Sequence, residues 1–168
     1  MNEAEFALLA ERSAPPGYDE LLRMSRSLFV GERDFIANSA NLSALLYQFL
    51  PDINWCGFYL LRGRELVLGP FQGKVACVRI AVGKGVCGTS AAQRRTLIVP
   101  DVEAFPGHIA CDAVSRSEIV VPMLAGDRLL GVLDIDSPNR SRFGVEDGEG
   151  LERIVEALLV ASDPPHLG

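Results

Sequence analysis

One stretch of the chain, from Lys74 to Asp136, gathers residues that could carry redox chemistry. It holds three of the four cysteines and a group of acidic residues, namely Cys77, Cys87, Cys111, Glu118, Asp134 and Asp136. Thiolates attack electrophilic sulfur and exchange with disulfides, while clustered carboxyl groups bind cations or retain a proton. The stretch is therefore predicted to be a redox active site.

The cysteines are predicted to be mostly reduced thiols. Residues 1–12 contain three glutamates where a secretory signal has positive charge and then an apolar run, so we expect a cytoplasmic protein. Cytosolic reductants oppose structural disulfides. The cysteine spacing contains no Cys-x-x-Cys pair and no His-x-x-x-His pair of the kind that closes a zinc site. No bound metal is predicted.

The cysteines also differ in their surroundings. Cys56 lies inside an apolar strand pattern and is interpreted as a small buried hydrophobe. Cys111 lies in an irregular segment beside His108 and Asp112, where polar neighbours can tune a thiol, so we expect a reactive role there. His108 is a candidate general base for Cys111, but an offset of three residues does not ensure contact. Cys87 falls in the first turn of an expected helix, whose N-terminus favours a thiolate.

Asp134 and Asp136 share one face of an otherwise apolar strand. They are either part of a solvated outer face, or a pocket that binds an ammonium group or keeps one carboxyl group protonated. Trp55 and Tyr59 share a face of another strand, where aromatic side chains serve as core packing or as the wall of a ligand pocket. The residues alone leave both alternatives open.

Composition limits the class of protein. With 168 residues, 48% of them hydrophobic and 23% charged, the chain fits one soluble domain. No apolar run approaches the roughly 18 residues of a membrane span, so no membrane association is expected. The net charge of −6 opposes non-specific binding to nucleic acid and leaves cationic or zwitterionic ligands open.

The hydrophobic periodicity predicts an α+β fold. The expected helices are 18–30, 34–50, 86–93 and 146–161, and the expected strands are 53–60, 65–68, 75–82, 97–99, 118–124 and 129–135. This order indicates an antiparallel sheet of about six strands, joined mostly by hairpins and covered by helices. We expect residues 1–15 to be an appendage, 16–162 a single domain and 163–168 a frayed tail.

The register of the last hairpin decides whether Glu118 faces Asp134 and Asp136. If Gly126 and Asp127 form a two-residue turn, Glu118 lies opposite Ile135 and faces away from Asp134. Glu118 then joins the two aspartates only if a bulge intervenes or if Glu118 lies outside the strand.

Several segments resemble the free methionine-(R)-sulfoxide reductases, which are stand-alone GAF domains. The resemblance runs from about residue 18 to about residue 160. The segments that carry it are Asn54-Trp55-Cys56-Gly57-Phe58-Tyr59, Leu68-Gly69-Pro70-Phe71-Gln72-Gly73, Gly83-Lys84-Gly85-Val86-Cys87-Gly88-Thr89, Val99-Pro100-Asp101-Val102, Phe105-Pro106-Gly107-His108-Ile109-Ala110-Cys111-Asp112, Ser117-Glu118-Ile119-Val120-Val121-Pro122 and Gly131-Val132-Leu133-Asp134-Ile135-Asp136-Ser137.

This resemblance implies a GAF-like sheet with the N- and C-terminal helices on one face and a loop-covered pocket on the other. It implies that Cys111 attacks the sulfoxide, that Cys77 resolves the product, and that Cys87 is a third cysteine able to exchange into the disulfide. The implied pocket residues are Trp55, Tyr59, Glu118, Asp134 and Asp136, with Glu118 or Asp136 as the proton donor. It implies thioredoxin as reductant, no bound cofactor, and a homodimer.

Two other classes of function remain open at this stage. A GAF-like pocket could sense a small ligand, with cysteines that respond to oxidants but no turnover. A structural or interaction domain with inert thiols is the third alternative.

Overall fold

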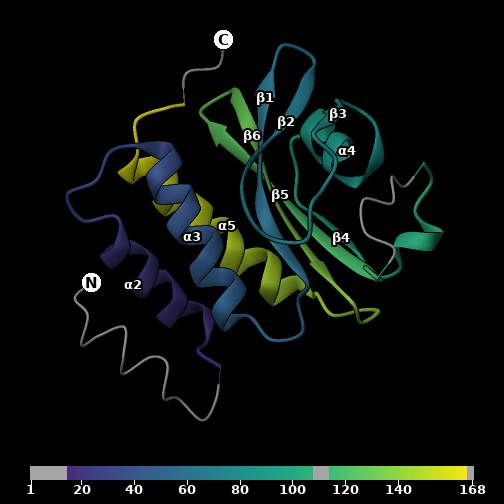
Figure 1. The fold of residues 1–168 in the computed structure, drawn as a ribbon, viewed down its shortest axis with the longest axis horizontal. Helices are drawn as coiled ribbons and strands as arrows, with labels where there is room; N and C mark the ends of the chain where they lie inside the picture. The colour runs from purple at the N-terminus through teal and green to yellow at the C-terminus, as the bar shows by residue number, and fades with distance from the viewer. Residues whose placement is uncertain (1–14, 108–113, 166–168) are drawn as a thin grey trace.

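One antiparallel sheet forms the centre of the fold (Figure 1). The computed structural model describes residues 15–107 and 114–165, and in these the sheet has six strands in the order β3-β2-β1-β6-β5-β4. The strands are β1 (Trp55–Arg62), β2 (Glu65–Gly73), β3 (Arg79–Ala81), β4 (Leu97–Val99), β5 (Ser117–Ala125) and β6 (Arg128–Ser137). The expected α+β architecture is confirmed.

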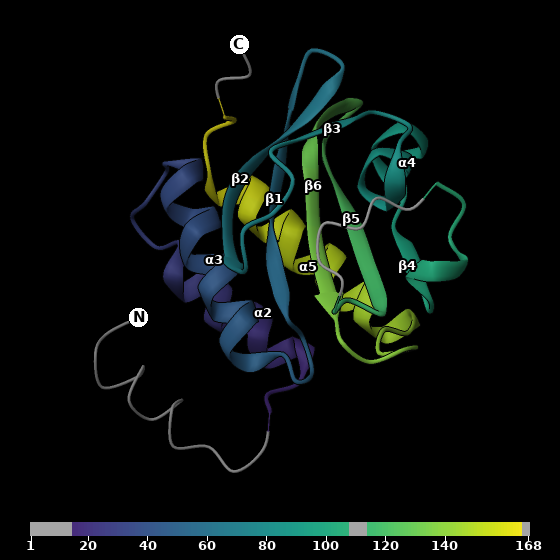
Figure 2. The same ribbon diagram turned by 45° about the vertical axis from the view of Figure 1, so that its right-hand side comes forward.

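Four α-helices are described, and they lie on opposite faces of the sheet (Figure 2). They are α2 (Tyr18–Leu28), α3 (Phe35–Phe49), α4 (Gly85–Gln93) and α5 (Val145–Ala161), with a short 3-10 turn at Val102–Ala104. Helices α2, α3 and α5 form a layer over one face, and α4 lies on the other. No helix in the described ranges is both long enough and apolar enough to cross a membrane.

Two apolar clusters hold these layers together. The larger lies under α2, α3 and α5 and contains Cys56, Phe58 and Leu60 from β1. The smaller lies under α4 and contains Trp55 and Tyr59, the residues of β1 that alternate with the first set. Side chains alternate along β1, so one set of residues packs into the larger cluster. The other set faces α4, on the side of the sheet that carries the candidate site.

Two strands depart from the sequence expectation. The strand expected at 75–82 is confined to β3, because Val75 and Val78 are 89% and 63% exposed and the segment before β3 leaves the sheet. The strand expected at 65–68 continues to Gly73, so the expected loop at 69–73 is wrong. Pro70 is tolerated in β2 because β3 pairs only with residues 65–67, which leaves Pro70 on a free edge.

The last hairpin contains the bulge that Glu118 needs in order to face Asp134 and Asp136. Leu124 pairs with Leu129, as a two-residue turn requires, but Met123 pairs with Gly131, so Leu130 is an extra residue. Beyond the bulge Glu118 pairs with Asp136, and directly paired residues share a face. The bulge therefore brings Glu118 to the face of the two aspartates.

We expect Gly131→Ala to lower the free energy of unfolding by about 2 to 4 kcal/mol. Gly131 adopts a φ of +154°, and a Cβ there would lie 2.1 Å from the carbonyl oxygen of Tyr59. Denaturant unfolding measures the loss. The control is Gly126→Ala in the same hairpin, where φ is +59° but no atom lies within 4 Å of the new Cβ. Equal losses in the two variants would contradict the close-approach argument.

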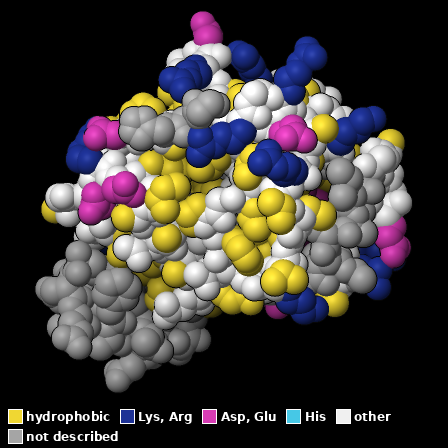
Figure 3. All heavy atoms as spheres, turned by 45° about the horizontal axis from the view of Figure 1, so that its top comes forward, with side chains coloured by type: hydrophobic (Ala, Val, Ile, Leu, Met, Phe, Trp, Pro, Cys, Tyr) yellow, Lys and Arg dark blue, Asp and Glu magenta, His cyan; other side chains and the backbone are white. Residues whose placement is uncertain are grey.

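The end of the sheet at the hairpin turns is basic, although the whole chain is acidic. Figure 3 shows lysine and arginine side chains gathered on this face. A cavity of about 830 Å³ lies there and is lined by Arg64, Arg94 and Arg128. Its described lining contains no cysteine or carboxylate, so it is separate from the predicted redox site.

Candidate active site

Neighbouring strands β1, β6 and β5 place the acidic and aromatic residues on one face of the sheet. Asp136 pairs with Trp55 on one side and with Glu118 on the other, while Asp134 pairs with Gly57. Glu118 and Asp134 are each only 6% exposed. The solvated outer face was an alternative for Asp134 and Asp136, and it is wrong for Asp134, whereas Asp136 is half-buried.

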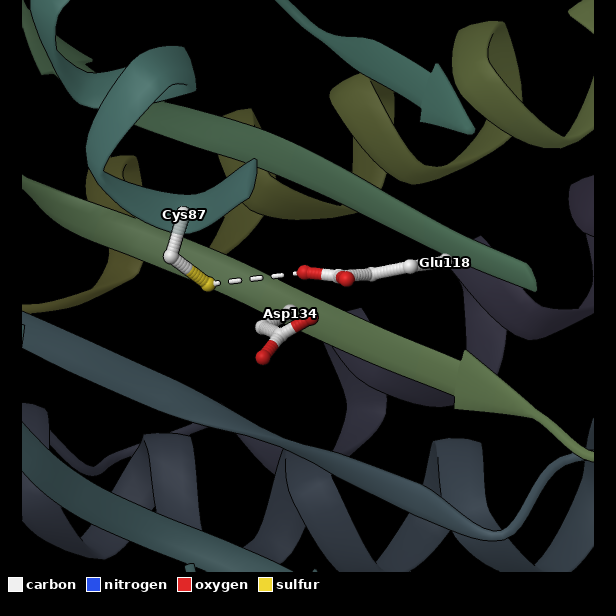
Figure 4. A group of neighbouring side chains, drawn as sticks. All are labelled: Cys87, Glu118 and Asp134. Atoms are coloured by element: carbon white, nitrogen blue, oxygen red, sulfur yellow. Dashed lines mark hydrogen bonds between the residues drawn. The ribbon is translucent and has the colours of Figure 1, made fainter. Parts of the chain in front are cut away.

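Cys87 reaches the same point from α4 (Figure 4). Its Sγ lies 3.8 Å from Oε1 of Glu118, and one ligand atom each from Cys87, Glu118 and Asp134 lie within 4.8 Å of one another. Helix α4 approaches the sheet closely because residue 88 is glycine, where a Cβ would lie 2.3 Å from the Ala81 carbonyl oxygen. We call Cys87, Glu118 and Asp134 the buried triad.

The triad strongly perturbs its own ionisation. Burial raises the pKa of Asp134 to about 6. The pKa of Glu118 is raised well above its ordinary value, first by burial and then by the negative charges of Asp134 and Asp136. Both shifts favour the protonated acid, and burial together with the neighbouring negative charges makes Glu118 hold its proton more tightly than an ordinary carboxyl group does.

The expectation of a thiolate at Cys87 is wrong. Burial raises its pKa well above the ordinary thiol value, and the charges of Asp134 and Glu118 raise it further. The N-terminus of α4 offers a favourable dipole, but desolvation beside two carboxyl groups outweighs a contribution of at most about 2 kcal/mol. Cys87 is a protonated thiol in this environment.

Asp134 has an unused binding capacity. Its Oδ1 is fully buried and has no hydrogen-bond partner among the described residues. A buried acceptor without a partner is costly, so such groups are rare and call for an explanation. The oxygen is suited to accept a hydrogen bond from a cationic ligand.

Trp55 and Tyr59 hold the segment that contains Cys77. The indole Nε1 of Trp55 donates a hydrogen bond to the Lys74 carbonyl, and the Tyr59 hydroxyl donates one to the Cys77 carbonyl, each at 3.0 Å. The two rings stack with centroids 5.8 Å apart. This role was missed from the sequence, because strand periodicity shows which face a ring occupies but not where its polar atom points.

Phe71 was also missed. Its ring stacks on Trp55 with centroids 5.4 Å apart, which makes a row of three aromatic rings. Gly57 permits this row, since a Cβ there would lie 2.3 Å from the Cβ of Phe71. The aromatic residue beside Gly69-Pro70 was a usable signal, but the loop expected there concealed it.

We expect Tyr59→Phe to reduce the free energy of unfolding by about 1 kcal/mol, the usual net contribution of one hydrogen bond. The backbone of 74–78 should also exchange its amide hydrogens faster, because the Cys77 carbonyl loses its donor. Hydrogen exchange followed by mass spectrometry measures this locally. The control is Tyr47→Phe, which removes the hydroxyl of a tyrosine that is 40% exposed. Unchanged exchange at 74–78 would argue against the anchoring role.

The cysteines differ in redox state. Cys77 is disulfide-bonded, whereas Cys56 and Cys87 carry free thiols. Cys56 is fully buried on the face opposite the triad, as its strand pattern predicted. Cys111 and His108, the expected nucleophile and candidate base, lie outside the described residues.

Comparison with known proteins defines the class. Residues 34–161 match the GAF domain family. The free methionine-R-sulfoxide reductase of Escherichia coli is 52% identical over 166 residues, which cover 97% of this chain and 94% of the relative. The chain is therefore a GAF domain. More specifically, it belongs to the free methionine-(R)-sulfoxide reductase family.

Solved structures agree with this assignment. The reduced form of fRMsr from Staphylococcus aureus is 53% identical and superimposes with a TM-score of 0.85, covering 88% of this chain and 96% of that one. The Neisseria meningitidis free methionine-R-sulfoxide reductase, solved in complex with its substrate, is 44% identical with a TM-score of 0.83, covering 86% of this chain and 87% of that one.

Proposed function

We propose that this chain reduces free methionine-(R)-sulfoxide to methionine with its own thiols and is recycled by thioredoxin. The observation that carries the proposal is the buried triad, in which an ionisable Asp134 with an unpartnered oxygen lies beside Glu118, whose raised pKa favours the protonated acid. Such a pair offers one acceptor for an ammonium group and one proton donor for a sulfoxide oxygen.

The ammonium group of the substrate is assigned to the carboxylates of Asp134 and Asp136. Its methyl-sulfoxide end lies against Trp55, beside Tyr59. A buried carboxylate oxygen without a hydrogen-bond partner favours a ligand that brings its own positive charge. A peptide-bound methionine sulfoxide lacks the free ammonium and carboxylate groups and would leave buried polar groups unpaired, so the site selects the free amino acid.

In the chemical step the Cys111 thiolate attacks the sulfoxide sulfur. Glu118 donates a hydrogen bond to the sulfoxide oxygen and increases the electrophilicity of the sulfur, with Asp136 as the other candidate donor. The attack forms a transient bond between the Cys111 Sγ and the substrate sulfur, and the sulfoxide oxygen takes up a proton. The oxygen then moves to Sγ as the substrate S–O bond and the transient S–S bond break, so methionine leaves and Cys111 becomes a sulfenic acid. Cys111 is thereby oxidised while the substrate sulfur is reduced.

Cys77 then condenses with the sulfenic acid, which forms a disulfide and releases water. The dithiol of thioredoxin reopens that disulfide by exchange, and Cys87 is a third thiol that can enter the exchange. Two observations support Cys77 as the resolving residue: it is the disulfide-bonded cysteine among those described, and Tyr59 anchors its carbonyl.

We expect substrate binding to weaken as the pH falls through about 6. Below that pH Asp134 takes up a proton, and a neutral carboxyl group no longer balances the substrate ammonium. Turnover should fall as Glu118 loses its proton, and its raised pKa moves that loss to a higher pH than for an ordinary carboxyl group. Titration calorimetry with a catalytically inactive variant and a pH profile of kcat separate the two effects. An affinity that does not change between pH 5 and pH 8 would contradict the role of Asp134.

The proposed reaction is tested by supplying thioredoxin, its reductase and NADPH. Adding free methionine-(R)-sulfoxide should start NADPH consumption, whereas the S epimer and a peptide containing the sulfoxide should not. A sensor domain without turnover would bind the amino acid but consume no NADPH. That outcome would overturn the enzyme proposal.

We also propose a cytoplasmic homodimer. Val30 and Val160 are 80% and 75% exposed and line a common cavity between α2 and α5, and these exposed apolar side chains support an interface there. Sedimentation of the protein and of Val160→Glu measures the assembly.

A further inference from the structure

We propose that the buried triad is also a binding site for a thiophilic divalent cation of the zinc class, and that the bound cation excludes the substrate. Ligand atoms from Cys87, Glu118 and Asp134 lie within 4.8 Å of one another, on three elements that are far apart in the chain. The second part of the proposal rests on the proposed function, because it assigns the substrate ammonium to the same place.

The donor set determines the class of cation. One sulfur and two carboxylate oxygens match zinc or cadmium, whereas magnesium and calcium bind oxygen ligands alone. Zinc bonds of about 2.3 Å to sulfur and about 2.1 Å to oxygen imply a sulfur to oxygen separation of about 3.6 Å in a tetrahedral site. The Cys87 Sγ and Glu118 Oε1 are 3.8 Å apart, so this sulfur and this oxygen already lie close to the separation that a tetrahedral zinc site requires.

The unpartnered oxygen of Asp134 is independent evidence for a ligand. Asp134 is 6% exposed, and its Oδ1 has no hydrogen-bond partner among the described residues. Figure 4 shows the Asp134 carboxyl group beside the line that joins Cys87 to Glu118. A cation held by all three side chains brings positive charge to the Asp134 carboxyl group and neutralises the buried carboxylates.

Spacing rules could not find this site, because its ligands come from α4, β5 and β6 and not from one short motif. The sequence expectation that no metal binds rested on such motifs alone. The juxtaposition follows from the bulge that turns Glu118 to this face and from the close approach of α4 at Gly88.

The test measures zinc and cadmium binding by titration calorimetry in the Cys77→Ser/Cys111→Ser background. This background leaves Cys56 and Cys87 as the remaining thiols. We expect one cation per chain, and with cadmium an ultraviolet thiolate charge-transfer band. Cys87→Ala should weaken binding by about 100-fold or more, since removing a group that only orients a zinc ligand already costs about 10- to 100-fold. Glu118→Gln should also weaken cation binding.

The matched control is Cys56→Ala, which removes the buried thiol on the opposite face of the sheet and should leave cation affinity unchanged. Equal affinity in Cys87→Ala and its parent, or no binding to the parent, would overturn the site. Free methionine-(R)-sulfoxide should compete with the cation, and simultaneous binding of both would overturn the exclusion. If the cation binds in a Cys87-dependent way and the sulfoxide does not bind at all, the cation site stands and the proposed function fails.

Discussion

Cys111→Ser is expected to abolish turnover of free methionine-(R)-sulfoxide while the variant still binds it. A serine hydroxyl is a far weaker nucleophile than a thiolate, and it cannot form the sulfenic acid from which the disulfide arises. We expect kcat to fall by at least about 1,000-fold, as when an enzyme loses its nucleophile. The thioredoxin-coupled NADPH assay measures the rate, and calorimetry measures the affinity.

The variants Cys56→Ser and Cys77→Ser are the controls for this result. Cys56 lies in the structural core, so Cys56→Ser should keep kcat within about threefold even if stability falls. Cys77→Ser should still form one methionine per chain, and the sulfenic acid should then persist and react with a dimedone probe. Full turnover in Cys111→Ser would sink the assignment of the nucleophile.

Asp134→Asn should stabilise the protein at pH 8 while it abolishes substrate binding. The folded protein holds the Asp134 proton more tightly than the unfolded chain does, because burial raises the pKa to about 6. Stability from this group is therefore present below about pH 4 and is lost as the pH rises through about 6. The neutral amide avoids this loss, so we expect about 1 to 3 kcal/mol more stability at pH 8 and little change at pH 4.

The same substitution removes the charge that receives the substrate ammonium. Loss of one partner of a buried charge pair costs about 2 to 5 kcal/mol, so affinity should fall by about 30-fold or more. Denaturant unfolding at the two pH values and calorimetry with the sulfoxide measure both effects. Asp127→Asn, at the exposed turn of the same hairpin, is the control and should change neither. A stability gain that is equal at pH 4 and pH 8 would contradict the charge argument.

Much of the fold could be predicted because its elements are periodic and capped. Helix α3 begins after Asp34, whose side chain accepts a hydrogen bond from the Ala37 amide, and β4 occupies the expected residues 97–99. Segment 75–82 was misassigned because its apolar residues alternate as in a strand. The exposed Val75 and Val78 show that this alternation does not mark a buried face along the whole segment. Polar atoms of Trp55 and Tyr59 hold its first part instead.

The site was predictable as a set of residues but not as an arrangement. Parity along β5 and β6 identified the need for a bulge, yet nothing local marks Leu130 as the extra residue. The ionisation of Cys87 was predicted wrongly, because the sequence favoured a thiolate and the structure favours the protonated thiol. A helix start is visible in the sequence, whereas burial against Glu118 and Asp134 depends on contacts between distant elements.

Reduction of free methionine-(R)-sulfoxide by the chain's own thiols is tested most directly by a single turnover without any recycling partner. The protein is reduced, freed of reductant and mixed with excess free methionine-(R)-sulfoxide, and methionine and free thiols are counted. We expect one methionine per chain, the loss of two thiols, and a disulfide between Cys77 and Cys111 in the peptide map. Absence of methionine, or equal yields from the R and S epimers, would contradict this expectation.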